Sequence, residues 1–125
     1  LIVEDNRLER KIVHHLLELN FGKDLYIDDV ADGNQALDYL RKQKYDLVIT
    51  DLIMPKTEGI ELIRNLHQNH PSVKIIAVSG SNPYYLYMAK KIGIDGMFTK
   101  PLNKEPFLSK INHLLQLKPV SIAGS

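Results

Sequence analysis

The sequence has 125 residues, enough for one domain built around one hydrophobic core. Its 16 basic and 15 acidic residues give a net charge of +1, and the lack of any run rich in lysine or arginine argues against direct nucleic-acid binding. Cysteine is absent, which excludes disulfides, thiolate nucleophiles and cysteine-based metal sites. No apolar run approaches the roughly 20 residues that span a bilayer, so we expect no membrane insertion.

Short apolar runs alternate with segments of helical periodicity through the first half of the chain. Residues 1–3 predict a strand, and the leucines and isoleucines that follow them are spaced for a helix ending near residues 20–22. Residues 25–30 predict a second strand, and a short helix is expected to open at Gly33. Residues 47–50 predict a third strand that is apolar on both faces, as a central parallel strand should be.

The second half of the chain continues the same alternation of helices and strands. The predicted elements, in chain order, are a loop between Pro55 and Gly59, a helix over 60–66, a strand over 73–78, a helix from Asn82-Pro83 to Ile92-Gly93, a strand over 96–99 and a helix from about Glu105-Pro106. Five strand–helix units predict a three-layer α/β fold, a doubly wound parallel sheet with helices on both faces. Residues 119–125 lack periodicity and are expected to be a tail or linker, which leaves residues 1–118 as the domain.

Reactive side chains follow four of the five predicted strands, where sheets of this kind place their functional groups. Glu4 and Asp5 follow the first strand, Asp51 the third, Ser79 the fourth and Lys100 the fifth. Three neighbouring carboxylates repel one another unless a cation is present. Mg²⁺ (or Mn²⁺) is the cation that such a set, together with waters and a phosphate oxygen, is expected to hold.

Asp51 occupies the position that suits a nucleophile, because it ends the central strand. A carboxylate there could attack phosphorus and form a covalent phosphoryl intermediate. The metal and Lys100 would offset charge on the phosphoryl oxygens, so that catalysis is mainly electrostatic.

Several segments of the sequence resemble the signature segments of response-regulator receiver domains, the switches of two-component signalling. They are residues 1–6 (LIVEDN), 51–55 (DLIMP) with Gly59 following, 100–101 (KP), and 31–37 (ADGNQAL) at the link from the second strand to the second helix. The resemblance runs from Leu1 to about Leu117, nearly the whole chain. It implies a flavodoxin-like (βα)5 fold with strand order 2-1-3-4-5.

The resemblance also implies a role for each residue at the strand ends. Asp51 is the implied phosphoacceptor; Glu4, Asp5, Asp51 and the backbone carbonyl of Ile53 are the implied Mg²⁺ ligands; Ser79 and Lys100 are expected to contact the phosphoryl oxygens. The phosphodonor would be a histidine kinase or a phosphotransfer protein in a bacterial cytoplasm. Phosphorylation would change the surface formed by the fourth helix, the fifth strand and the fifth helix, which could act on a downstream partner or form a homodimer. Self-phosphorylation and self-dephosphorylation at Asp51 are the only catalysis expected.

The sequence departs from the family pattern at the position that follows the switch. Met97 stands three residues before Lys100, where the family usually has tyrosine or phenylalanine, and methionine can still repack into a pocket. Phe98 beside it is expected to be a core residue. Ile53 and Ser81, two residues after Asp51 and Ser79, are not strong general bases, which favours slow hydrolysis of the phosphoryl group. In the family Pro101 follows a cis peptide bond, although general frequencies favour trans.

Two other functions stay open from the sequence. A haloacid-dehalogenase-like phosphatase would also use Asp51 as nucleophile, but it needs a second aspartate where Ile53 stands. A degenerate receiver would keep the fold and act only as a binding module. His67 and His70 could chelate a metal weakly, although surface positions are the simpler interpretation. Tyrosines 84, 85 and 87 predict either boundary packing or a surface for a partner.

Overall fold

The computed structural model describes residues 1–54, 58–80 and 83–117, and in these residues it has five strands and five α-helices. The elements are β1 (Ile2–Val3), α1 (Arg7–Phe21), a 3₁₀ helix (Gly22–Asp24), β2 (Asp29–Val30), α2 (Gly33–Lys42), β3 (Leu47–Asp51), α3 (Glu58–Asn69), β4 (Lys74–Ser79), α4 (Pro83–Ile92), β5 (Gly96–Thr99) and α5 (Lys104–Leu115). All strand pairs are parallel, and the sheet order is β2-β1-β3-β4-β5. The predicted doubly wound fold and its strand order are therefore confirmed.

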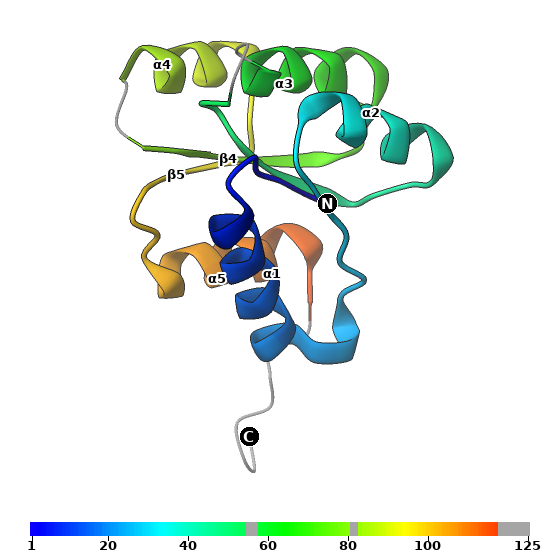
Figure 1. Ribbon diagram of the computed structural model, residues 1–125, viewed down its shortest axis with the longest axis vertical. Helices are drawn as coiled ribbons and strands as arrows, with labels where there is room; N and C mark the ends of the chain where they lie inside the picture. The colour runs from blue at the N-terminus through cyan, green and yellow to red at the C-terminus, as the bar shows by residue number, and fades with distance from the viewer. Residues whose placement is uncertain (55–57, 81–82, 118–125) are drawn as a thin grey trace.

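The helices cover the sheet in two layers (Figure 1). Helices α2, α3 and α4 lie on one face, and α1 and α5 lie on the other. Neighbouring residues of β3 serve both sides: Val48 is buried in the core beneath α2–α4, and Ile49 is buried in the core shared with α1 and α5. Every residue of β3 is buried, which explains the continuous apolar run in the sequence.

Side-chain caps fix the starts of α1 and α2 directly after the strands that precede them. The Oδ1 atom of Asn6 accepts a hydrogen bond from the backbone N–H of Glu9 (3.0 Å). Asp32 caps α2 by accepting from the N–H of Gln35 (2.8 Å), while the Gln35 side chain accepts from the N–H of Ala31 (2.8 Å). This reciprocal pair is a capping box, and it explains why Asp32 and Gln35 stand at this spacing.

Several predicted boundaries were wrong by a few residues. The strand predicted over 25–30 pairs only at Asp29 and Val30, because its partner β1 contributes two residues, and a 3₁₀ helix precedes it. β3 extends to Asp51, β4 covers Lys74–Ser79, and α5 begins at Lys104. Asn82, the loop residues 55–57 and the predicted tail 119–125 lie outside the described residues, so the expectations for them stay predictions. None of the helices in the described segments has the length and apolar character that a bilayer span requires.

Candidate functional site

The carboxylates predicted from the sequence meet at the carboxyl ends of β1 and β3. One oxygen from each of Glu4, Asp5 and Asp51 lies within 4.8 Å of the others. Glu4 and Asp51 are buried, each 6% exposed, whereas Asp5 is exposed. The site is therefore a shallow acidic pocket with two buried carboxylates at its base and one at its surface.

The backbone around Asp51 holds its carboxylate in place. Asp51 is the last residue of β3, and its Oδ1 atom accepts a hydrogen bond from the N–H of Ile53 (2.9 Å). The N–H of Leu52 donates to the carbonyl of Val78 (2.9 Å), which extends the pairing with β4 past Asp51. These bonds leave Oδ2 of Asp51 as the oxygen that faces Lys100.

Glu4 is anchored by α1, the helix that follows it. Its Oε2 atom accepts from the N–H of Asn6 (3.2 Å), and its backbone carbonyl accepts from the guanidinium of Arg10 (2.8 Å). Arg10 also pairs with Asp29 (3.2 Å), so the same side chain connects the site to β2.

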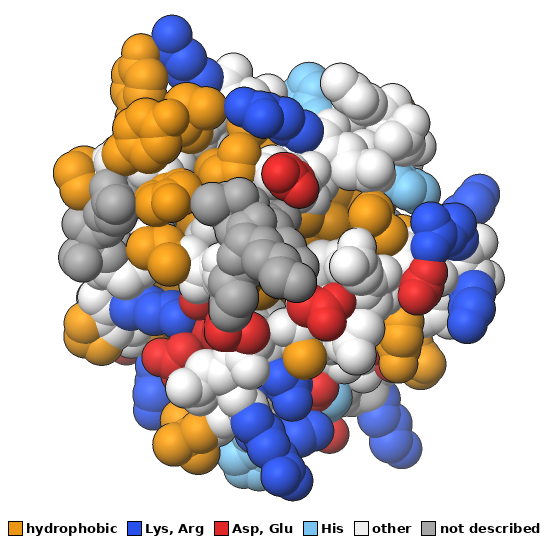
Figure 2. Space-filling view, turned by 45° about the horizontal axis from the view of Figure 1, so that its top comes forward, with side chains coloured by type: hydrophobic (Ala, Val, Ile, Leu, Met, Phe, Trp, Pro, Cys, Tyr) orange, Lys and Arg blue, Asp and Glu red, His pale blue; other side chains and the backbone are white. Residues whose placement is uncertain are grey.

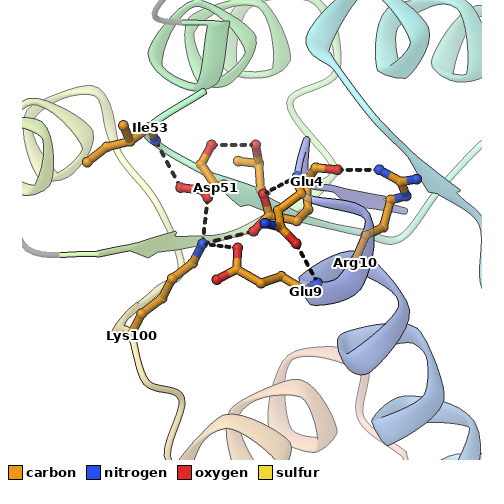
Figure 3. A network of polar contacts seen from close by, with 8 residues as sticks. Glu4, Glu9, Arg10, Asp51, Ile53 and Lys100 are labelled. Carbon is orange, nitrogen blue, oxygen red and sulfur yellow. Dashed lines mark hydrogen bonds and ion pairs between the residues drawn. The ribbon is translucent and has the colours of Figure 1, made fainter. Parts of the chain in front are cut away.

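Lys100 lies at the centre of the site and contacts three carboxylates (Figure 3). Its Nζ atom is 2.7 Å from Asp51, 2.9 Å from Glu4 and 2.9 Å from Glu9. Glu9 was not predicted from the sequence. The signal available was its place in the first turn of α1, four residues after Asp5, where a helical side chain can turn back towards the end of β1.

The pKa values of these groups show that the site has an excess of negative charge. Burial raises the pKa of Glu4 to about 8, against the opposing hydrogen bond from Lys100 and with the help of the neighbouring Asp51 charge. Burial alone would lower the pKa of Lys100, but its hydrogen bonds to Asp51, Glu4 and Glu9 outweigh burial and raise it. The hydrogen bond from Lys100 lowers the pKa of Glu9.

The donor set fits a divalent cation such as Mg²⁺. The three carboxylates are hard oxygen donors gathered at one point, and the raised pKa of Glu4 means that one of them is partly protonated near neutral pH. A cation would remove that repulsion and favour the ionised form. The described residues contain no other group of three such ligands, so the weak chelate considered for His67 and His70 lacks a third ligand there.

Ser79 ends β4 beside this site, and its hydroxyl is unused. The Oγ atom is fully buried and has no hydrogen-bond partner among the described residues. The Ser79 carbonyl accepts from the N–H of Lys100 (2.8 Å), which aligns the ends of β4 and β5. A buried hydroxyl without a partner costs stability, so its presence favours a role in binding a ligand.

The two residues before Thr99 point to opposite faces of β5. Phe98 packs edge-to-face against Phe107 of α5, with ring centroids 5.5 Å apart, so its predicted place in the core is confirmed. Met97, the next residue along the strand, is half-buried and pairs with Ala77. The peptide bond between Lys100 and Pro101 is cis.

Comparison with known proteins identifies the family. The family model of the response regulator receiver domain matches residues 1–112. The chain belongs to the response regulator receiver domain family. This receiver domain is 36% identical over 122 residues to the 3',5'-cyclic-nucleotide phosphodiesterase regA of Dictyostelium discoideum, covering 93% of this chain and 15% of that protein. It is 32% identical over 120 residues to the response regulator ArlR of Staphylococcus aureus, covering 95% of this chain and 53% of that protein.

Solved structures agree with the fold of the receiver domain. A signal receiver domain of an HD domain-containing protein from Pseudomonas fluorescens Pf-5 superimposes with a TM-score of 0.85 at 24% identity, covering 92% of this chain and 91% of that one. A CheY-like receiver domain protein from Methanospirillum hungatei JF-1 gives a TM-score of 0.82 at 25% identity, covering 92% and 90%. The chain thus spans about half of ArlR and a small part of regA, so the same domain is found in proteins of different length.

Hydrophobic side chains gather over α4 on the face shown in Figure 2. Tyr84 and Tyr87 are 61% and 56% exposed, and the ammonium of Lys91 lies 5.1 Å from the centre of the Tyr87 ring. Tyr85 and Met88 are partly buried against the core beneath α2–α4. The aromatic stretch therefore combines both interpretations of the sequence, with inner residues that pack and outer residues that face solvent.

Proposed function

We propose that this receiver domain is a phosphorylation switch that accepts a phosphoryl group on Asp51 in the presence of Mg²⁺. The observation that supports it most directly is the 2.7 Å contact between Oδ2 of Asp51 and the ammonium of Lys100, beside two further carboxylates that can hold a cation. A structural ion-pair network would not require the buried, unpaired hydroxyl of Ser79 next to these groups.

The chain's own residues divide the work of phosphoryl transfer. Glu4, Asp5 and Asp51 would hold Mg²⁺, with the backbone carbonyl of Ile53 as a predicted further ligand; the cation would neutralise charge on the transferred group. An oxygen of Asp51 attacks phosphorus, and the bond from phosphorus to the donor nitrogen of a phosphohistidine breaks, leaving the electron pair on the imidazole. The ammonium of Lys100 stabilises charge on the phosphoryl oxygens. The hydroxyl of Ser79 donates a hydrogen bond to one of them.

Ile53 supports a switch over a phosphatase. A phosphatase that uses Asp51 as nucleophile needs an acid two residues later, and Ile53 offers an apolar side chain that is 43% exposed. The same apolar side chain provides no base to activate water. The proposed product is therefore a phosphoaspartate that persists long enough to be read by a partner.

The donor and the output are proposed at the level of the family. A histidine kinase or phosphotransfer protein would supply the phosphoryl group, as in two-component signalling. The surface around α4, β5 and α5, with exposed Tyr84 and Tyr87, would carry the signal to a partner, an attached domain or a second copy of the chain. A bacterial cytoplasmic location stays a prediction.

Intact mass spectrometry tests this function. The domain is incubated with acetyl phosphate and Mg²⁺, beside Asp51→Asn and a sample containing a chelator. The expected result is the gain of one phosphoryl group, lost in both controls. A folded domain that binds Mg²⁺ yet gains no mass, from acetyl phosphate or from a panel of phosphorylated histidine kinases, would instead indicate a receiver that acts by binding alone.

A further inference from the structure

Glu9 adds a fourth carboxylate to the site, and it shares the ammonium of Lys100 with Glu4 and Asp51 (Figure 3). An ammonium has three N–H donors. Each of the three carboxylates lies within 2.9 Å of Nζ, so they occupy all of these donors. Lys100 must therefore release a carboxylate before it can donate to a phosphoryl oxygen.

Glu9 differs from the other two partners of Lys100 in its exposure. Its side chain is 45% exposed, against 7% for Glu4 and 6% for Asp51. It lines the same cleft of about 220 Å³ as Glu4, Asp51 and Lys100. Its carboxylate thus lies at the solvent side of the site, where an anion approaching Asp51 is exposed to its charge.

The charge balance of the site changes when Glu9 is counted. The charges of Glu4, Asp5 and Asp51 are neutralised by one Mg²⁺ together with Lys100, and Glu9 adds one further negative charge. We propose that Glu9 is a specificity-determining residue, whose charge strengthens binding of the divalent cation and disfavours phosphodonors in proportion to their negative charge. The inference rests on the proposed function, because it concerns the donor of the same reaction.

Two small phosphodonors of different charge test this inference. Near neutral pH acetyl phosphate is a dianion, and phosphoramidate is a zwitterion with one net negative charge. In both reactions an Asp51 oxygen forms a bond to phosphorus; the bond from phosphorus to the acetate oxygen or to the nitrogen breaks, and acetate or ammonia leaves with the electron pair. Because Coulomb energy is proportional to charge, removing the Glu9 charge should change the logarithm of the rate about twice as much for acetyl phosphate.

The experiment compares Glu9→Gln with two other variants. Glu9→Asp keeps the charge on a shorter side chain and separates charge from the contact with Lys100. Glu18→Gln makes the same charge change farther along α1, on an exposed side chain that faces His14. Second-order rate constants of phosphorylation are measured by intact mass at saturating Mg²⁺ for both donors, and the Mg²⁺ dissociation constant is measured by calorimetry without donor.

For Glu9→Gln we expect the rate constant to rise roughly fivefold with acetyl phosphate and roughly twofold with phosphoramidate, and Mg²⁺ binding to weaken by roughly threefold. Glu9→Asp should keep the donor preference of the wild type, and Glu18→Gln should change neither quantity. An equal gain with both donors would assign Glu9 to positioning Lys100 and overturn the inference, as would no gain with either. If the wild type itself takes up no phosphoryl group, the proposed function fails; an unchanged Mg²⁺ dissociation constant in Glu9→Gln would then overturn the inference independently.

Discussion

Gly59 lies directly against the backbone of Asp51. A Cβ atom at position 59 would stand 2.3 Å from the carbonyl oxygen of Asp51 and 2.7 Å from the Cα atom of Leu52. These contacts are with backbone atoms, which cannot move aside as the end of a flexible side chain can. The first turn of α3 is therefore packed against the end of β3 so closely that only glycine fits.

Replacing Gly59 with alanine should destabilise the domain and displace the phosphoacceptor. We expect a loss of about 2 kcal/mol in the free energy of unfolding, because the methyl group forces α3 away from β3. The phosphorylation rate of Asp51 should fall with it. Gly80→Ala is the matched control, since a Cβ there meets nothing within 4 Å. Urea unfolding of both variants decides the point, and equal stabilities would show that α3 yields easily.

Ser79→Ala should separate stability from function. The Oγ atom of Ser79 is buried without a partner among the described residues, so its removal should stabilise the metal-free domain by about 1 kcal/mol. The same change should slow phosphorylation, because the phosphoryl oxygens lose a hydrogen-bond donor. Ser109→Ala on the exposed side of α5 is the control and should leave both properties unchanged. A Ser79→Ala variant that is less stable than the wild type would indicate that the hydroxyl already has a partner in solution.

The alternating pattern of the sequence was sufficient to predict the fold. Runs such as residues 47–50 are apolar because both faces of β3 are covered, and this burial is what makes the pattern visible. The end of β2 was predicted less well, because its pairing depends on the length of β1 and not on its own side chains. Asp51, Glu4, Asp5, Ser79 and Lys100 could be brought together on paper because parallel strands end at one edge of a sheet.

Glu9 could not be placed with the same certainty, since its contact depends on the direction of α1 after β1. That direction is set by the Asn6 cap and by the bond from Arg10 to the Glu4 carbonyl, both of which are tertiary details. An acidic residue in the first turn of a helix is also common for a general reason, its favourable interaction with the helix dipole. The sequence pattern therefore gave no reason to connect Glu9 with Lys100, 91 positions away.

The stability of the metal-free domain should fall as the pH rises. The pKa of Glu4 is raised from 4.5 to about 8, so the folded state binds this proton more tightly than the unfolded chain does. The contribution of Glu4 is complete below pH 4.5 and is lost as the pH approaches 8. We expect unfolding in urea with a chelator to show a decrease of about 2 kcal/mol between these limits that is specific to Glu4.

Glu4→Gln isolates this effect, because glutamine cannot ionise. The difference in stability between wild type and Glu4→Gln should change with pH in the predicted direction, and saturating Mg²⁺ should reverse the trend for the wild type by binding the ionised carboxylates. Asp24→Asn, which alters an exposed carboxylate in the 3₁₀ helix, provides a comparison. A pH dependence that is the same in wild type and Glu4→Gln would contradict the raised pKa.

The lifetime of the phosphorylated state should depend on Ile53. This side chain follows the phosphoacceptor by two residues and is 43% exposed, so a group placed there reaches the solvent next to Asp51. Ile53→Glu supplies a carboxylate that can accept a proton from an attacking water, and we expect dephosphorylation to accelerate by about tenfold or more. Ile53→Val keeps the position apolar and should leave the rate within about a factor of two of the wild type, since it adds no base. Loss of the phosphoryl group is followed by intact mass after the donor is removed. If Ile53→Glu and Ile53→Val lose it equally fast, access of water and not the missing base limits hydrolysis, and the lifetime is set elsewhere in the site.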